Sequence, residues 1–184
     1  MNFSKILSIV ILVVLAANAR PTFAAEKLAG SSATFISYFR EPLADRRVDV
    51  LKAYLQQYDS PLADYAKVFV DNADKYNLDW RLVAAISGLE STFGHAIPIN
   101  SYNGWGWGIY GDNVLRFNSW PEAIETISKG LRENYLKDKV ESDPYFIGPT
   151  YAASPTWAVR VQYFMDSIEA FKLNQPKSSL SLSI

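Results

Sequence analysis

The stretch AAISGLESTFG, from Ala84 to Gly94, places one acid among small and apolar residues. Its first six residues have the composition of a helix packed inside a protein, and Gly94 supplies a stop signal. Glu90 stands in this run directly after Leu89. Because burying a carboxylate without a partner is costly, Glu90 requires a physical reason to be there.

A helical projection puts Glu90 inside the apolar stripe of the expected helix. With Leu82 at zero and about 100° per residue, Glu90 falls at about 80°. Ile86 at about 40° and Val83 at about 100° lie on either side of it. We therefore expect a buried carboxyl that stays protonated and can donate a proton to a leaving oxygen. The alternative is a structural glutamate that caps backbone N–H groups or pairs with an arginine such as Arg160.

The composition of the 184 residues limits the possible chemistry. An apolar fraction of 49% with 14% aromatic residues allows one packed domain. The chain has no cysteine and a single histidine, His95. Disulfides and thiolate metal sites are therefore excluded, and a histidine-rich zinc site or a Ser-His-Asp triad is disfavoured. We expect neither a metal nor a cofactor.

Residues 1–24 have the pattern of a secretory signal peptide. Lys5 precedes an apolar run, Ile6–Ala17, and small residues suited to cleavage follow at Ala17–Ala19 and Thr22–Ala24. The run is about 12 residues long, whereas a membrane span needs roughly 20. We expect a secreted, periplasmic or cell-wall-associated protein with no stable membrane span after cleavage. An uncleaved membrane anchor is the alternative.

The rest of the chain is expected to form a linker (25–45), one domain (46–174) and a mobile tail (175–184). Residues 1–24 carry two cations and no acid, so the formal charge of −1 becomes −3 without them. A mildly acidic domain without a basic run is a poor binder of nucleic acid.

Cap residues and apolar periodicity predict a domain of helices around one long loop. Gly94–Phe117 is rich in glycine, asparagine and tryptophan and has no helical period, so it is expected to be a loop or a short hairpin. The fold class expected is all-α to α+β. The expected helices are Val48–Gln57, a helix opened by Ser60-Pro61, Trp80–Ser91 capped by Asp79, Ala123–Tyr135 behind a Ser119/Glu122 capping box, and a last helix from Ser154-Pro155 to Lys172.

The loop stretch NSYNGWGWGIYG, Asn100–Gly111, has the composition of a sugar-binding surface. Flat aromatic rings bind the apolar faces of sugars, amides bind their polar edges, and glycines let the backbone approach a ligand. At least one of the two tryptophans is expected in the core. The glycines also spell G-x-G-x-x-G, but no strand precedes them and no helix follows, which argues against a dinucleotide site. The candidate ligand-binding residues are Tyr102, Asn103, Trp105, Trp107 and Tyr110.

Several motifs together resemble the lysozyme-like superfamily. They are Gly88–Gly94 (GLESTFG), Asn103–Gly106 (NGWG), and Tyr151-Ala152 before a final helix that bears Trp157. The likeness covers about Pro61 to Phe171. It is strongest to bacterial glucosaminidase domains described as mannosyl-glycoprotein endo-β-N-acetylglucosaminidase-like, and the Glu-Ser pair is shared with lytic transglycosylases.

The resemblance implies a lysozyme-like helical domain in which Glu90 is the catalytic acid at the cleft. It also implies that Tyr151 lies near the acid, and that Ser91 belongs to the substrate site. The Gly-Leu-Met-Gln stretch of transglycosylases is absent, and an aromatic Gly-Trp-Gly loop stands instead. This departure argues against lyase chemistry.

A second catalytic group is not settled by the sequence. Glycosidases usually pair an acid with a second carboxylate, and Asp112 is the only acid between Glu90 and the next expected helix. Its Gly-Asp-Asn setting also suits a turn. The remaining routes use the N-acetyl group of the substrate or a water held by Tyr151 or Tyr110.

The sequence therefore predicts a secreted, monomeric glycoside hydrolase that cleaves β-1,4 bonds of an N-acetylhexosamine glycan. Cell-wall peptidoglycan is the expected polymer substrate, and an endo-β-N-acetylglucosaminidase or muramidase the expected type. Two alternatives stay open. One is a glycan-binding module without activity, and the other is a lytic transglycosylase that forms anhydro ends.

Overall fold

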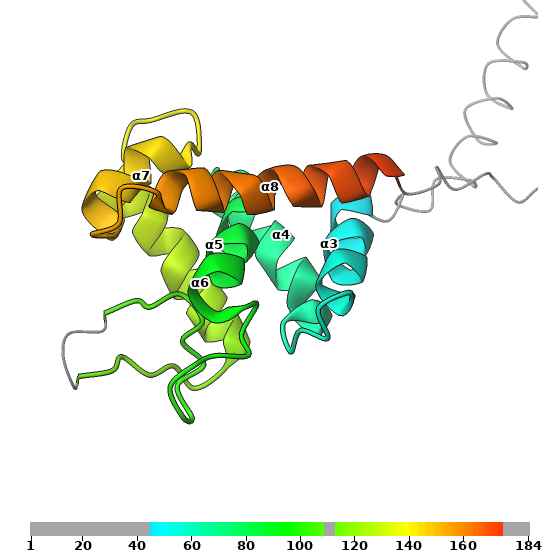
Figure 1. Cartoon of the computed structure of the whole chain (residues 1–184), viewed down its shortest axis with the longest axis horizontal. Coiled ribbons are helices and arrows are strands. Elements are labelled where there is room, and N and C mark those ends of the chain that lie inside the picture. The colour runs from blue at the N-terminus through cyan, green and yellow to red at the C-terminus, as the bar shows by residue number, and fades with distance from the viewer. Residues whose placement is uncertain (1–44, 109–112, 175–184) are drawn as a thin grey trace, which may run out of the picture. The chain divides into compact units, whose positions relative to one another are not determined.

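The computed structural model describes residues 45–108 and 113–174, and this part of the chain is helical (Figure 1). The elements are α3 (Arg46–Gln56), the 3-10 turn η1 (Ala63–Tyr65), α4 (Ala66–Lys75), α5 (Leu82–Ser91), α6 (Trp120–Gly130), the π-helix η2 (Leu131–Leu136), α7 (Pro144–Tyr151) and α8 (Trp157–Asn174). Because the described residues contain no extended strand, the all-α form of the prediction is confirmed. The expected signal peptide, most of the linker and the tail lie outside the described residues.

Polar side chains cap the first turns of several helices. The Ser119/Glu122 box is predicted from the sequence, whereas the Asp45 cap of α3 is not. Asp45 accepts a hydrogen bond from the backbone N–H of Arg47 at the start of α3. Ser119 accepts from the N–H of Glu122 at the start of α6. The return bond of this capping box is shifted by one residue, since Glu122 accepts from the N–H of Asn118.

Several helix boundaries differ from the prediction, and two of them lie at cap residues that the sequence identified. Ser60 does cap a turn, because its hydroxyl oxygen accepts from the N–H of Leu62, but a 3-10 turn comes before α4. Asp79 accepts from the N–H of Arg81, and the regular helix begins only at Leu82.

Helix α7 was not predicted at all. Its sequence, PYFIGPTY, contains a glycine and an internal proline, Pro149, which intrinsic propensity disfavours. The helix forms because it is packed against α8 on one side and η2 on another. Asp143 supplies its cap by accepting from the N–H of Tyr145.

Helix α5 runs through the centre of the core. Its residues from Leu82 to Gly88 are all buried, and α8 crosses over it (Figure 1). Burial of each large apolar side chain in this contact stabilises the fold by about 1.5–3 kcal/mol. The side chains of α8 that enter the core are Trp157, Ala158, Val161, Met165 and Ile168.

No helix in the described part of the chain is both long and apolar enough to cross a membrane.

The chain turns sharply where α5 ends. Thr92, Phe93 and Gly94 all have positive φ angles, of 51°, 54° and 89°. The N–H of Phe93 donates to the carbonyl of Ser87, and its ring folds back so closely that a Cβ on Gly88 would lie 2.6 Å from it. This turn ends the helix directly after Glu90 and Ser91 and starts the long loop.

Trp105 fixes that loop to the core. Its side chain is fully buried, and its indole N–H donates to the carbonyl of Val83 at 2.8 Å. The ring also contacts Phe69 and Trp120, with centroids 6.2 and 6.1 Å away. The expectation that one loop tryptophan is a core residue is confirmed. The side chain of Trp105, predicted as a ligand-binding residue, is therefore placed inside the core and not at the surface.

We predict that Trp105→Ala lowers the free energy of unfolding by about 3–5 kcal/mol, because it removes a large buried side chain and leaves a cavity. Urea denaturation measures the loss. Ile99→Ala is the matched control, since Ile99 is 84% exposed and its truncation changes stability by less than about 0.5 kcal/mol. A loss below about 1 kcal/mol for Trp105→Ala would contradict a core role.

A pH-dependent prediction follows from Asp79, which precedes α5. Burial raises the pKa of its carboxyl, but hydrogen bonds from the side chain and N–H of Arg81 lower it more, so the net shift is downward. A lowered folded-state pKa adds stability above the unfolded value of about 4, and this stability is lost as the pH falls through the folded-state pKa. We expect Asp79→Asn to cost about 1–2 kcal/mol at pH 7. The difference from wild type, followed by denaturation at several pH values, should shrink below about pH 4.

Candidate functional site

Glu90 lies in the last turn of α5, and its side chain is exposed to solvent. The expectation of a buried carboxyl is therefore wrong. The helical projection assumes that a partner covers the apolar stripe along the whole helix, whereas α5 ends one residue later, at Ser91. The neighbours Ile86 and Val83 lie one turn or more further back and are fully covered.

The carboxylate of Glu90 is nevertheless held in place. The indole N–H of Trp157, at the first position of α8, donates to Oε1 of Glu90 at 2.7 Å. Trp157 is itself only 3% exposed, so the donor is fixed by packing. A hydrogen bond to an ionised group contributes about 1.5–3 kcal/mol where it is shielded from water. The alternative in which Glu90 pairs with an arginine is not seen, since the described residues include no ion pair of Glu90.

The second carboxylate oxygen faces the loop. A Cβ added to Gly106 would lie 3.6 Å from Oε2 of Glu90, so the backbone of the loop runs beside this oxygen. Gly106 has a φ angle of 64°, a conformation that a residue with a side chain rarely adopts. Glycine at this position thus allows the turn and keeps the space next to Oε2 open.

Tyr151 lies against the donor of this hydrogen bond. Its ring stacks on that of Trp157 with centroids 4.7 Å apart and an interplanar angle of 30°. Its hydroxyl donates to the carbonyl of Trp105 at 2.6 Å. Burial raises the pKa of Tyr151 well above its ordinary value, and the charge of Glu90 adds to the effect. Tyr151 is therefore a neutral hydrogen-bond donor that lies close to Glu90.

Two further aromatic side chains complete the cluster. The rings of Trp107 and Tyr135 lie 5.7 Å apart, and each is within 6 Å of the ring of Tyr151. Trp107 packs onto Gly130, where a Cβ would lie only 2.4 Å from the indole ring. The cluster joins the loop to three helical segments, which are the end of α6, the π-helix η2 and the end of α7. We call Trp107, Tyr135, Tyr151 and Trp157 the aromatic cluster.

Asn103 organises the loop and does not face solvent. Its amide N–H groups donate to the carbonyls of Trp107 and Leu115, and its amide oxygen accepts from the N–H groups of Trp105 and Trp107. The side chain is 2% exposed and its polar atoms are used inside the protein. The structure therefore places Asn103, predicted as a ligand-binding residue, inside the loop.

Ser91 also has a structural position. Its hydroxyl lies 2.8 Å from the carbonyl of Gly104, and its oxygen accepts from the N–H of Gly94. Ser91, predicted to belong to the substrate site, is 2% exposed and joins the end of α5 to the loop. Its bonds instead keep the loop beside Glu90.

The other predicted residues divide into two groups. Tyr102 is 39% exposed, packs edge-on against Trp120 at 5.4 Å and presents the rest of its ring to solvent, while Trp107 is half-buried. Tyr110 and Asp112 lie outside the described residues. The structure thus brings together Glu90, Tyr151 and Trp107. Among the described residues, Tyr102 makes its ring contact with Trp120 and not with these three.

Trp157, Tyr135 and Gly130 are site residues that the sequence did not identify as such. Trp157 was noticed only as part of a motif. No local signal indicates that its indole N–H reaches a carboxylate 67 residues away. The role of Gly130 becomes visible only when Trp107 occupies the space of its missing side chain.

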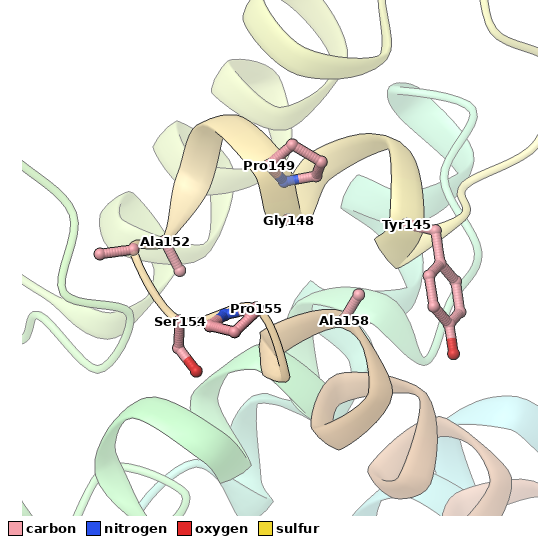
Figure 2. A pocket seen from close by; sticks show the side chains of 8 residues that line it. Tyr145, Gly148, Pro149, Ala152, Ser154, Pro155 and Ala158 are labelled. Atoms are coloured by element: carbon pink, nitrogen blue, oxygen red, sulfur yellow. The ribbon is translucent and has the colours of Figure 1, made fainter.

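A cavity of about 380 Å³ lies between α7 and the beginning of α8 (Figure 2). None of the candidate residues contributes to its wall. In Figure 2, Gly148 and Pro149 close it on the α7 side, and Ser154 and Pro155 close it on the side of the connecting turn. The complete lining is Tyr145, Gly148, Pro149, Ala152, Ala153, Ser154, Pro155 and Ala158.

Comparisons with known proteins find one type of similarity, to a solved structure. No family model matches the chain, and no curated protein matches it. Among solved structures, the catalytic domain of the autolysin Auto from Listeria monocytogenes is similar, with 17% sequence identity and a TM-score of 0.49. The match covers 83% of this chain and 99% of that domain. A similarity of this size does not by itself assign a fold family or an activity to the chain.

We predict that Glu90 and Trp157 are energetically coupled. A double-mutant cycle of Trp157→Phe and Glu90→Ala isolates their interaction, because phenylalanine removes the N–H donor and keeps an aromatic ring, while alanine removes the acceptor. The expected coupling is about 1 kcal/mol, reduced from the buried value because Glu90 is exposed. Trp120→Phe with Glu90→Ala is the control cycle and should show none. Equal coupling in both cycles would contradict the assignment.

Proposed function

We propose that this chain is a glycoside hydrolase that cleaves β-1,4 bonds in an N-acetylhexosamine glycan, with Glu90 as the general acid. The observation that carries this proposal is an exposed carboxylate held by a buried indole N–H, beside a glycine-rich backbone and an aromatic cluster. The motifs that resemble glucosaminidases supply the same residues. Peptidoglycan is the proposed polymer.

The geometry gives the two oxygens of Glu90 different roles. Oε1 accepts the hydrogen bond of Trp157, while Oε2 accepts none from the described residues. Oε2 is therefore the oxygen proposed to carry the proton.

In the first step, the proton of Oε2 moves to the glycosidic oxygen as the bond between that oxygen and C1 of the sugar breaks. The sugar ring is left with oxocarbenium character, and Glu90 is left as a carboxylate. The N–H of Trp157 then stabilises the new negative charge at Oε1. This interaction is stronger after proton transfer than before it, as catalysis requires.

The second step needs a group that completes the attack on C1. Asp112, the N-acetyl group of the substrate, or a water held by Tyr110 or Tyr151 could do so. The hydroxyl of Tyr151 already donates to Trp105, so it can only accept from such a water, and its raised pKa makes it unsuitable as a base. Tyr151 is thus proposed as a positioning group near the acid.

The surfaces proposed to hold sugar rings are Tyr102 and the half-buried Trp107. A ring that is partly covered has a fixed orientation, and its free face can stack on a sugar at little entropic cost. Asn103, Trp105 and Ser91 act indirectly by fixing the loop. We further propose that the domain works as a monomer outside the cytoplasm after removal of residues 1–24.

Two other functions share this site. The described residues place one carboxylate at the aromatic cluster. This favours either a glycan-binding module without turnover or a lytic transglycosylase, which needs only one acid. Both alternatives differ from a hydrolase in their products. A binding module releases nothing, and a transglycosylase leaves anhydro ends.

We predict that Glu90→Gln lowers the rate of glycan cleavage by about 10²–10⁴-fold without loss of folding, because it removes only the proton donor. The measurement is mass spectrometry of purified peptidoglycan after incubation with residues 25–184. Glu125→Gln is the matched control, since Glu125 is exposed and pairs with Lys75. It should keep full activity.

New reducing ends that appear with wild type and not with Glu90→Gln would support the hydrolase, and the terminal sugar would identify the bond. Anhydro ends would support the lytic transglycosylase in place of the hydrolase. Equal cleavage by both proteins would overturn the role of Glu90. Retention on the glycan without any fragments would leave the binding module.

A further inference from the structure

A second cavity of about 380 Å³ is formed by cationic side chains. It lies between the end of α4 and the turn that follows η2. Of its lining residues, four carry a positive charge and one a negative charge, in a chain whose formal net charge is −1. The sequence shows no basic run, because these cations come from separate segments. The lining consists of Lys75, Tyr76, Asn77, Arg132, Lys137, Asp138, Lys139 and Val140.

Arg132 builds the wall of this pocket. Its guanidinium donates to the backbone carbonyl of Tyr76 at 2.8 Å and to that of Lys139 at 2.7 Å. Further hydrogen bonds go to the carbonyls of Asn77 and Lys137. One side chain thereby holds two turns together. Because four carbonyls occupy it, its planar fork is not free to bind a ligand side-on.

Lys137 stands at a position where glycine is expected. Its φ and ψ angles are 45° and −113°, and the N–H of Lys139 donates to the carbonyl of Leu136 at 2.7 Å. These values match the first central residue of a type II′ turn, which is normally glycine. A lysine held there is strained, and such strain clusters at functional sites. The strain therefore suggests a use for the side chain.

The charges that remain free are those of Lys137 and Lys139. Both side chains are exposed, and among the described residues neither forms an ion pair. Lys139 also lies 4.9 Å from the ring centroid of Phe146. Lys75, by contrast, is paired with Glu125 at 2.6 Å. With Asp138 as the one acid in the lining, the pocket keeps a surplus of positive charge.

We propose that this pocket is a binding site for a phosphate group. Two ammonium groups on flexible stems act as point charges, which suits a compact, doubly charged oxyanion. Planar carboxylates are better recognised by a free guanidinium fork, and that of Arg132 is already occupied. The site is separate from Glu90, so it stands or falls independently of the glycosidase proposal. The phosphate is carried either by a soluble polyanion or by a lipid headgroup.

The test is isothermal titration of the chain with tripolyphosphate at low and moderate salt. Wild type is expected to bind, with an affinity that falls as salt rises. Lys137→Gly with Lys139→Gln is expected to weaken binding at least about tenfold. Lys67→Gln is the control, because Lys67 is exposed and pairs with Asp71 elsewhere on α4. It should bind as wild type does, and so should Glu90→Gln.

Lys137→Gly alone separates a functional lysine from a structural one. Glycine relieves the positive φ, so the melting temperature is expected to rise by a few degrees while phosphate affinity falls. Co-sedimentation with phosphatidylcholine vesicles, with and without phosphatidic acid, distinguishes the two sources, because phosphatidic acid carries a phosphate monoester that can bear two charges. Binding only to the charged vesicles that is lost in the double variant supports a lipid headgroup. Failure of wild type to bind either probe, or unchanged affinity in the double variant, would overturn the proposal.

Discussion

The crossing of α8 over α5 determines where every other part of the site can lie (Figure 1). The contact is apolar along most of its length, and at one end it closes with the hydrogen bond from the indole of Trp157 to the carboxylate of Glu90. The buried residues of both helices set the relative position of the helices. The position of this hydrogen bond is therefore determined by packing in the core. The packing of the two helices thereby fixes the orientation of the Glu90 carboxylate.

The loop after α5 depends on the same constraint. Trp105 enters the core from the loop, and Tyr151 donates to the carbonyl of Trp105 from the end of α7. Asn103 satisfies four backbone groups of the loop with one amide. A segment rich in glycine and aromatic residues is therefore rigid at its base, where it passes Glu90. Rigid support of this kind is what a proton donor needs for a constant geometry.

Much of the fold could be predicted from the sequence, because caps and periodicity are local. The box at Ser119 and the long non-helical segment after Gly94 were both recognisable, and Glu90 could be singled out. Its exposure could not be predicted, since a helical projection does not show where the partner elements end. Helix α7 was missed because tertiary packing overrides the low propensity around Pro149.

The same limit applies within the candidate site. Ser91, Asn103 and Trp105 have the residue types of a glycan site, but hydrogen bonds and burial within the loop use them. Conversely, Trp157 and Tyr135 come from distant segments, and only the folded chain brings them to Glu90 and Tyr151. Composition singled out the region, and tertiary contacts decided which of its members face the solvent.

The central claim is that Glu90 delivers a proton to a glycosidic oxygen from Oε2, the oxygen that accepts no hydrogen bond from the described residues. A crystal structure of Glu90→Gln with a bound N-acetylglucosamine oligomer tests this most directly. The account predicts a glycosidic oxygen within about 3 Å of the residue 90 side chain, with Trp157 still donating to the other side of that group. An oligomer bound with every glycosidic oxygen far from residue 90 would contradict it.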